Sequence, residues 1–337
     1  MKLMSAMVVL GLCLATAKAV ALQADGAVAL QADGAVALHL DVMEGGGFSP
    51  RLEAQAPEAT SLNGKPLTRP ATLPNQQKLE ADLAQAQKTL AANPKDPDAL
   101  IWVGRRYGYL WRFQDAIAAF TRGIAAYPDS PKFYRHRGHR YLSTRQFAKG
   151  QADFEKAAAL IKGKPDEVEP DGAPNPAGKP RGTLQFNIWY HLGLSHYLQG
   201  NFAKAYDAYV ECMKVSNNDD AIVATSDWMW MTLMRLNRKA EAAKVLERIT
   251  PKMEILENGS YHRRLLMYKG LEKPEALLDT AKADDTTIAT QGYGVGNYYL
   301  VIGDAKKARE VFEKVISGGG WNAFGFIAAE SDLQRMK

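Results

Sequence analysis

From Asn75 onward, apolar side chains recur every three or four residues, the spacing of amphipathic helices. The pattern is clearest over Asn187–Cys212, where one apolar segment ends near Gly200-Asn201 and a second segment follows at once. Such an interruption predicts two helices joined by a tight turn. The first helix of the series is expected over Asn75–Ala92, because Asn93-Pro94 ends its pattern.

Small and aromatic residues mark the helical pairs at fixed positions. Gly104 and Gly138 lie 34 residues apart, a period associated with helix–turn–helix repeats. In each of three pairs a second small residue follows the glycine by twelve positions, and an aromatic residue follows by four more. These sets are Gly104, Ala116 and Phe120; Gly138, Gly150 and Phe154; and Gly193, Ala205 and Tyr209. Small residues allow two helix axes to approach, and the aromatic ring fills the remaining space.

These motifs resemble the tetratricopeptide repeat (TPR) family, whose pattern is W-x2-L-G-x2-Y, then A-x3-F, then P. Trp189-x2-Leu192-Gly193-x2-His196 matches this pattern with histidine in place of one aromatic residue. Weaker copies surround Gly104, Gly138 and Gly296, and a degenerate copy surrounds Trp230. The resemblance implies an all-α solenoid of about five to six repeats within a helical domain over residues 75–337. The repeat register near 255–285 stays open, and a capping helix is expected near 321–335.

The first 74 residues have a different character. Residues 1–19 combine Lys2, a short apolar run and Ala17-Lys18-Ala19, which is the order of a signal peptide. We expect cleavage after Ala19, a periplasmic or secreted protein of bacterial type, and no transmembrane anchor in the mature chain. Residues 20–74 contain the octad VALQADGA twice in succession and are expected to form a disordered spacer, although Ser61–Pro70 could pack against the first helix.

Composition narrows the function only slightly. The 337 residues carry a net charge of +5, which does not indicate nucleic-acid binding. The sequence has no glycine-rich phosphate loop followed by lysine, no nucleophile elbow and no HExxH motif. We therefore expect a non-enzymatic scaffold with no catalytic residue, no cofactor and no resident metal; the oligomeric state stays open.

An insertion interrupts the array between the second and third repeats. Gly193 follows Gly138 by 55 residues instead of 34, and the surplus corresponds to a proline-rich loop near 163–182. Long loops within compact domains are often functional. Four acidic residues of this loop could cover a groove, namely Asp166, Glu167, Glu169 and Asp171.

The family resemblance also implies a concave groove lined by the first helix of each repeat. Carried over residue by residue, the groove set is Ile101, Arg105, Tyr109, Lys132, Arg135, His136, His139, Asn187, Tyr190, His191 and Leu194. Some TPR domains hold a partner's C-terminal carboxylate with lysine, arginine and asparagine at such places. The identities differ here, so that specificity is not transferred. We expect a protein or peptide partner that is acidic or carries a free carboxylate.

The sequence permits three arrangements of the arginine and histidine cluster. The acidic loop could fold back and pair with Arg135, Arg137 or Arg140. The cluster could instead be an open site for a peptide carboxylate, a sugar acid or a phosphate. It could also bind a metal through His136, His139 and His191 with Glu167 or Asp166, although the flanking arginines would repel a cation.

Two other functions follow from specific residues. The first is a metal- or carboxylate-assisted hydrolase that uses His136, His139 and the acidic loop at 166–171. The second is an assembly scaffold that acts through an exposed surface around Trp228 and Met231. Burial of Trp228 within one chain would remove this second function.

Overall fold

The computed structural model describes residues 56–279 and 283–337. The predicted signal peptide and most of the predicted spacer, up to residue 55, lie outside these residues. The described part contains a two-stranded hairpin, β1 (Ala59–Thr60) and β2 (Pro66–Leu67). It also contains fourteen helices: α1 (Gln76–Ala92), α2 (Pro97–Tyr109), α3 (Phe113–Ala126), α4 (Pro131–Ser143), α5 (Phe147–Ile161), α6 (Leu184–Leu198), α7 (Phe202–Val215), α8 (Asp219–Arg235), α9 (Lys239–Glu247), α10 (Gly259–Tyr268), α11 (Pro274–Leu278), α12 (Asp285–Val301), α13 (Ala305–Ile316) and α14 (Phe324–Arg335).

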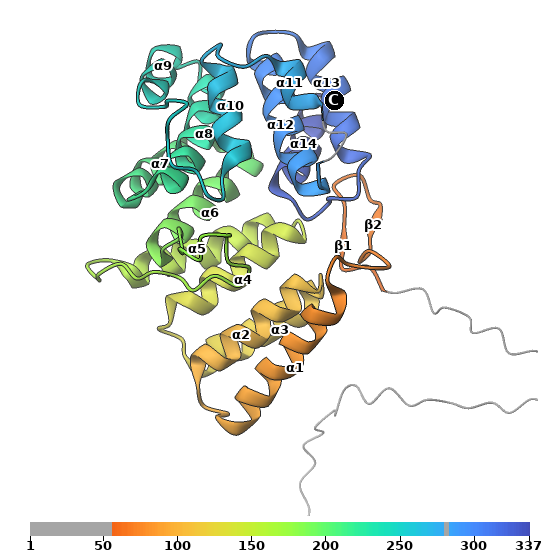
Figure 1. Ribbon diagram of the computed structural model, residues 1–337, viewed down its shortest axis with the longest axis vertical. Coiled ribbons are helices and arrows are strands. Elements are labelled where there is room, and N and C mark those ends of the chain that lie inside the picture. The colour runs from red at the N-terminus through yellow and green to blue at the C-terminus, as the bar shows by residue number, and fades with distance from the viewer. Residues whose placement is uncertain (1–55, 280–282) are drawn as a thin grey trace, which may run out of the picture. The chain divides into compact units, whose positions relative to one another are not determined.

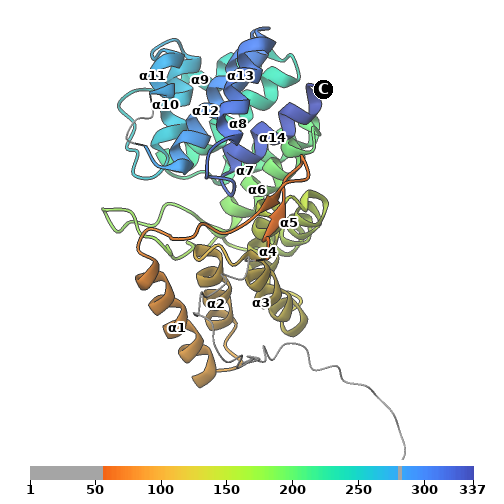
Figure 2. The same cartoon turned by 90° about the vertical axis from the view of Figure 1, so that its right-hand side faces the viewer.

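The helices stack in antiparallel pairs in the order of the chain (Figure 1). The pairs are α2–α3, α4–α5, α6–α7, α8–α9, the irregular α10–α11, and α12–α13. The first helices α2, α4, α6 and α8 also contact one another in turn, so they form one continuous row (Figure 2). This arrangement confirms the predicted all-α solenoid of five to six repeats. None of the helices within the described ranges is long and apolar enough to cross a membrane.

Capping side chains fix where several first helices begin. Each of four such residues accepts a hydrogen bond from a backbone N–H in the first turn, which satisfies a donor that has no partner within the helix. These residues are Asp96, Thr183, Asn218 and Asp284. Ser130 occupies the same position before α4, but its side chain makes no capping hydrogen bond, and Pro131 supplies the helical φ angle instead.

In the structure, the aromatic ring of each second helix packs directly on the glycine of the first helix, as the sequence pattern predicted. A Cβ atom added to Gly104 would lie 2.3 Å from the ring of Phe120, and one added to Gly193 would lie 2.5 Å from Tyr209. Gly138 and Gly296 meet Phe154 and Phe312 in the same way. The ring of the second helix therefore occupies the space that a side chain on the first helix would need, and this contact sets the packing within each pair.

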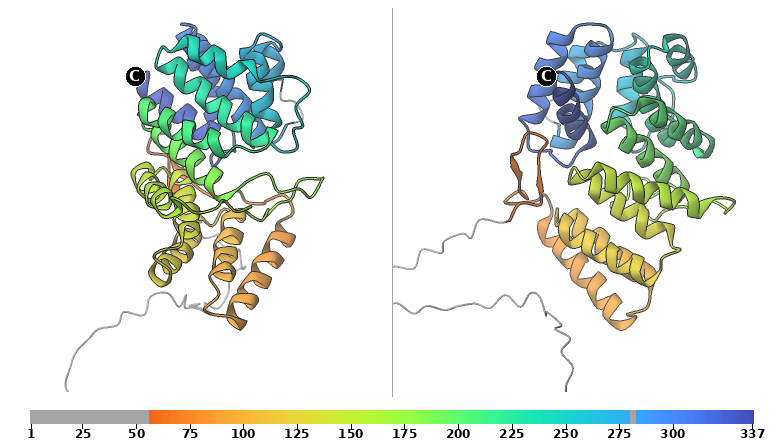
Figure 3. Two further views of the ribbon diagram at one scale, coloured as in Figure 1. Left: turned by 90° about the vertical axis from the view of Figure 1, so that its left-hand side faces the viewer. Right: turned by 180° about the vertical axis from the view of Figure 1, so that it is seen from behind.

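The C-terminal helix α14 does more than cover the last pair. It packs on α12 and α13, as a capping helix should, and it also reaches back to α6 (Figure 3). Arg145, at the turn between α4 and α5, forms an ion pair with Glu330 at 2.8 Å, with side chains only 3% and 2% exposed. Arg235 of α8 pairs with Asp332 of α14 at the same distance. These contacts join the second and fourth pairs to the C-terminus.

The expectation of a disordered spacer over residues 20–74 is wrong for residues 56–74. The hairpin pairs Ala59 with Leu67, and it lies between the first helices and the C-terminal segment (Figure 1). The Gln114 amide nitrogen donates to the Glu58 carbonyl at 2.6 Å, and the Trp321 indole donates to the Thr68 carbonyl at 2.8 Å. The segment is ordered because its backbone finds partners at both ends of the array, and such partners leave no local sequence pattern.

The surface predicted around Trp228 and Met231 is not a surface. Both side chains are 0% exposed. The Trp228 indole nitrogen donates to the Tyr190 hydroxyl at 2.7 Å, and the ring packs against Tyr197 and Tyr293. The assembly function proposed for this surface is therefore wrong, because helices on both sides cover this face of α8.

Candidate functional site

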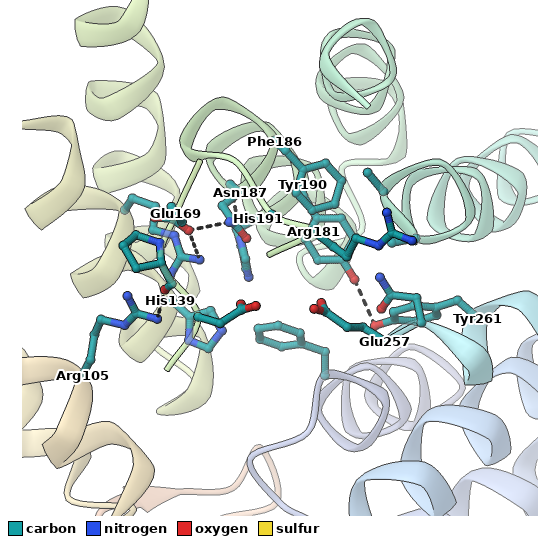
Figure 4. Close-up of a pocket in the computed structure, with 18 residues that line it drawn as sticks. Arg105, His139, Glu169, Arg181, Phe186, Asn187, Tyr190, His191, Glu257 and Tyr261 are labelled. Carbon is teal, nitrogen blue, oxygen red and sulfur yellow. Dashed lines mark hydrogen bonds and ion pairs between the residues drawn. The ribbon is translucent and has the colours of Figure 1, made fainter. Parts of the chain in front are cut away.

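A cavity of about 310 Å³ lies along the row of first helices (Figure 4). We call it the groove cavity. The helices α2, α4 and α6 contribute Arg105, Arg135, His139, Asn187, Tyr190 and His191 to its wall. The insertion contributes Glu169 and Asp171, and Phe324 enters from the start of α14. Six of the eleven predicted groove residues thus meet in one cavity.

Glu169 of the insertion reaches the centre of the predicted cationic cluster. Its Oε2 atom lies 2.8 Å from Nη2 of Arg135 and accepts a hydrogen bond from Nδ2 of Asn187 at 2.5 Å. Burial raises the pKa of the Glu169 carboxyl group, and the charge of Arg135 opposes that rise. The chain therefore holds one of its own carboxylates against an arginine and an asparagine from two successive first helices.

The rest of the insertion is anchored on both sides of Glu169. Arg105 donates to the Pro170 carbonyl at 2.8 Å, and Lys132 lies 3.1 Å from Glu167. Val168 pairs with Thr183 in an isolated β-bridge. Residues 163–182 contain no helix, yet these contacts hold the loop along the first helices. The arrangement in which the acidic loop folds back is present for Arg135, whereas Arg137 pairs with Asp153 within its own repeat.

The histidines of the cluster differ in exposure, because His136 and His191 are buried and His139 is half-buried. Burial is the main cause that holds the pKa of His191 well below its usual value, and the charge of Arg135 is the second. For His139, removal from solvent is likewise the main cause of a lowered pKa, and the charge of Arg140 is the second. The rings of His139 and His191 have centroids 4.8 Å apart, and each also contacts Phe324. These imidazoles therefore act in the wall as neutral rings with hydrogen-bonding nitrogens.

Other predicted groove residues lie elsewhere. Ile101 and Leu194 are core residues, because the first helices are packed on more than one face. His136 is buried and stacks on Phe120 with centroids 5.4 Å apart. Lys132 lies at the loop, outside the cavity wall. Tyr109 is also outside this wall, where its hydroxyl is 3.3 Å from Nη2 of Arg105.

The residues required for a hydrolase do not assemble. Among the residues with described positions, no three histidine, cysteine, aspartate or glutamate side chains are grouped so that they could hold a metal ion. Asp166 is used at the start of α6, where it accepts from the Gln185 backbone N–H at 2.9 Å. His136 faces Glu169 at 3.8 Å instead of Asp166 or Glu167. The geometry thus disfavours both the metal-binding arrangement and the hydrolase built on it.

The cavity wall also contains residues that were not predicted, among them Arg181, Glu257, Tyr261 and Phe324. Asp220 positions two of them, because its carboxylate accepts backbone N–H groups from residues 256–258 and lies 3.1 Å from Nε of Arg181. Arg181 lies at the end of the insertion, Glu257 and Tyr261 come from the irregular α10 region, and Phe324 begins α14. The repeat pattern is weak in all of these segments. The sequence signal for this part of the wall was the group of hydrogen-bond acceptors at the start of α8. Such a group is equally typical of an ordinary helix cap.

A comparison with models of protein families identifies one of the helical pairs. The sequence model of the tetratricopeptide repeat family matches residues 186–219, the third helical pair. A search of the curated proteins finds no match.

Three solved structures are similar to parts of the chain. A tetratricopeptide repeat protein from Parabacteroides merdae ATCC 43184 has 14% identity and a TM-score of 0.46, and the alignment covers 77% of this chain and 94% of that one. YrrB, described as a TPR protein with an unusual peptide-binding site, has 14% identity, a TM-score of 0.39 and coverage of 74% and 97%. PilW, described as a widely conserved type IV pilus biogenesis factor, has 17% identity, a TM-score of 0.41 and coverage of 72% and 86%. At these TM-scores the three structures place no constraint on the site.

Residues 186–219 match the tetratricopeptide repeat family, and the helical pairs on either side repeat the same glycine–aromatic contact. The chain therefore contains a tetratricopeptide repeat within a stack of similar helical pairs.

Proposed function

We propose that the chain is a non-enzymatic interaction scaffold whose groove cavity binds an acidic segment, or a free carboxylate, of a protein or peptide partner. One observation carries this proposal. The insertion places the Glu169 carboxylate against Arg135 and Asn187, so these two donors already bind one carboxylate of the chain itself. A partner's carboxylate would take the same two donors after Glu169 moves away.

The chemistry of the wall suits such a partner. A guanidinium group binds a carboxylate through two parallel N–H donors, and partial burial strengthens the contact. Tyr190, Tyr261 and Phe324 line the same cavity and offer an apolar surface to the side chain next to the carboxylate. The cavity volume of about 310 Å³ is at the lower end for a ligand site, which fits one or two residues of a peptide.

The insertion would act as a cover that exchanges with the partner. Glu169 has to leave Arg135 and Asn187 before a second carboxylate can enter, so binding competes with a contact inside the chain. The loop is proline-rich, and prolines lower the entropy that it loses on docking again. We place this activity in the cell envelope on the strength of the signal-peptide pattern in residues 1–19.

A panel of labelled peptides tests the proposal by fluorescence polarisation. The panel contains acidic peptides with a free C-terminus, the same peptides with an amidated C-terminus, and basic peptides. Arg135→Gln should weaken binding of acidic peptides by about tenfold or more, because a charge-assisted pair is lost. Arg122→Gln is the matched control, since Arg122 is exposed on the second helix α3. Equal affinity of acidic and basic peptides, or equal loss in both variants, would refute the site.

A further inference from the structure

A second cavity of about 230 Å³ shares Arg105, Arg135 and His139 with the groove cavity. It lies between α2 and α4, and Tyr109 and Arg140 complete its polar wall. We call it the arginine pocket. None of the four acidic residues of the insertion lines it. Three guanidinium groups therefore converge on a space that contains no carboxylate.

The charges around this pocket do not balance. Arg135 is neutralised by Glu169 at 2.8 Å. Arg105 donates to the Pro170 carbonyl and approaches the Tyr109 hydroxyl, and neither group carries a charge. Arg140 has no carboxylate within ion-pair distance among residues 56–279 and 283–337. Asp171 lines the groove cavity, where burial raises the pKa of its carboxyl group and the charge of Arg105 opposes that rise without forming an ion pair.

Arg140 differs in this respect from the other inward-facing arginines. Four arginines each meet a carboxylate at 2.8–2.9 Å, in the pairs Arg137–Asp153, Arg145–Glu330, Arg235–Asp332 and Arg264–Asp227. The fold thus pairs its buried guanidinium groups as a rule, as the cost of burying an unpaired charge requires. An unpaired arginine at the wall of a cavity is a departure from that rule.

Local packing holds Arg140 in this position. Gly108 leaves room for it, because a Cβ atom on Gly108 would lie 3.0 Å from Nη1 of Arg140. The guanidinium carbon lies 5.3 Å from the centre of the Phe113 ring, and the His139 ring is in contact with it. Burial, together with the charges of Arg135 and Arg105, lowers the pKa of Arg140 to about 9. A bound anion would reverse this unfavourable electrostatic arrangement.

We infer that the arginine pocket binds a doubly charged oxyanion of the phosphate type. Arg140 has no carboxylate partner among the described residues, and Arg105 faces the pocket without an ion pair of its own. A dianion supplies one negative charge for each of these two guanidinium groups, whereas a single carboxylate supplies one. Each guanidinium offers paired N–H donors to oxyanion oxygens. The Tyr109 hydroxyl and the neutral imidazole of His139 supply further hydrogen-bonding groups. This site goes beyond the proposed function, and its ligand need not be a protein.

Titration calorimetry with inorganic phosphate tests the inference on the full chain at about pH 7.5, where phosphate is largely dianionic. Acetate at matched ionic strength is the comparison anion. Phosphate should bind more tightly than acetate, and Arg140→Gln should weaken phosphate binding by about tenfold or more. Arg140→Lys should bind between these limits, because it keeps the charge and loses the paired donors. Arg122→Gln should bind like the unmodified chain.

Two results would overturn the inference: phosphate binding no tighter than acetate, or unchanged phosphate affinity in Arg140→Gln. Should that variant fail to fold by circular dichroism, Arg105→Gln carries the same test. A peptide with one phosphoserine, compared with free phosphate, distinguishes a phosphorylated partner from a small ligand. The outcome is separable from that of the proposed function, because the acidic peptides contain no phosphate and their binding depends on Arg135 and Glu169.

Discussion

Glu330→Gln removes the carboxylate that neutralises Arg145, at the point where α14 returns to the second helical pair. The two side chains meet at 2.8 Å and are 2% and 3% exposed. Arg145 also adopts φ of 63°, a left-handed conformation that glycine takes at the equivalent turn position Gly200. Arg145 therefore carries backbone strain at this turn, and its ion pair with Glu330 of α14 offsets that strain.

The expected loss follows from burial. Removing one partner of a buried ion pair leaves the other charge uncompensated, which costs about 3–5 kcal/mol. The double variant Arg145→Gly with Glu330→Leu removes both charges and relieves about 1 kcal/mol of backbone strain. We expect it to be more stable than Glu330→Gln by about 2 kcal/mol or more. Glu313→Gln, which breaks an exposed pair with Arg309 at 3.9 Å, should cost less than about 0.5 kcal/mol.

Urea unfolding followed by tryptophan fluorescence measures these differences. The assay is best run at about pH 8, because burial raises the pKa of Glu330 and the carboxyl group must be ionised. Glu330→Gln should also weaken peptide binding, since Phe324 of the same helix forms part of the cavity wall. A loss below about 1 kcal/mol, or a double variant no more stable than Glu330→Gln, would show that this pair does not hold α14.

Three further predictions concern packing and charge. In urea unfolding, Gly104→Ala should destabilise the fold by about 1–3 kcal/mol, because the new Cβ would meet the buried Phe120 ring at 2.3 Å. The control Gly259→Ala should cost less than about 0.5 kcal/mol, because the space around Gly259 is open. Asp227→Ala should cost about 3–5 kcal/mol in the same assay, because its arginine partner, 2.9 Å away, is 0% exposed. Because burial lowers the pKa of His191 in the folded chain, only the unfolded chain gains this proton as the pH falls below about 6.5. His191→Gln should therefore reduce the loss of unfolding free energy on acidification by about 1.4 kcal/mol per pH unit. An unchanged dependence of unfolding free energy on pH would contradict the burial of His191 as a neutral ring.

The repeated part of the fold was predictable because its determinants are local and periodic. Gly104 and Phe120 are sixteen residues apart and face each other in one pair, and the same spacing recurs at Gly138, Gly193 and Gly296. Contacts of this kind repeat along the chain and leave a visible period. The turn between α6 and α7 followed from the same signals, although the two helices extend from Leu184 to Val215, beyond the predicted Asn187–Cys212.

Long-range contacts left no such signal. Arg145 and Glu330 are 185 residues apart, and neither belongs to a repeated motif. The return of α14 also covers α6, where twelve of fifteen residues are buried, so Leu194 lies in the core instead of the groove. The ordered hairpin at residues 56–74 depends on partners such as Gln114 and Trp321 in the same way.

The sequence predicted the residues that the first helices contribute to the candidate site, and it missed residues that other segments contribute. Arg135, His139 and Asn187 share one face of the first-helix row, which the repeat positions specify. Glu257 and Phe324 reach the same cavity from irregular segments, whose path depends on the whole fold. The sequence also left open whether the acidic loop meets the cluster, and the Glu169 contact answers this for one arginine.

The affinity of Glu169→Gln for acidic peptides tests the central claim most directly. This variant removes the internal carboxylate and leaves Arg135 and Asn187 in place. If the groove cavity is a carboxylate site occupied by the chain's own insertion, acidic peptides should bind Glu169→Gln about tenfold more tightly than the unmodified chain, and Arg135→Gln more weakly. Equal affinity in all three proteins would contradict the account.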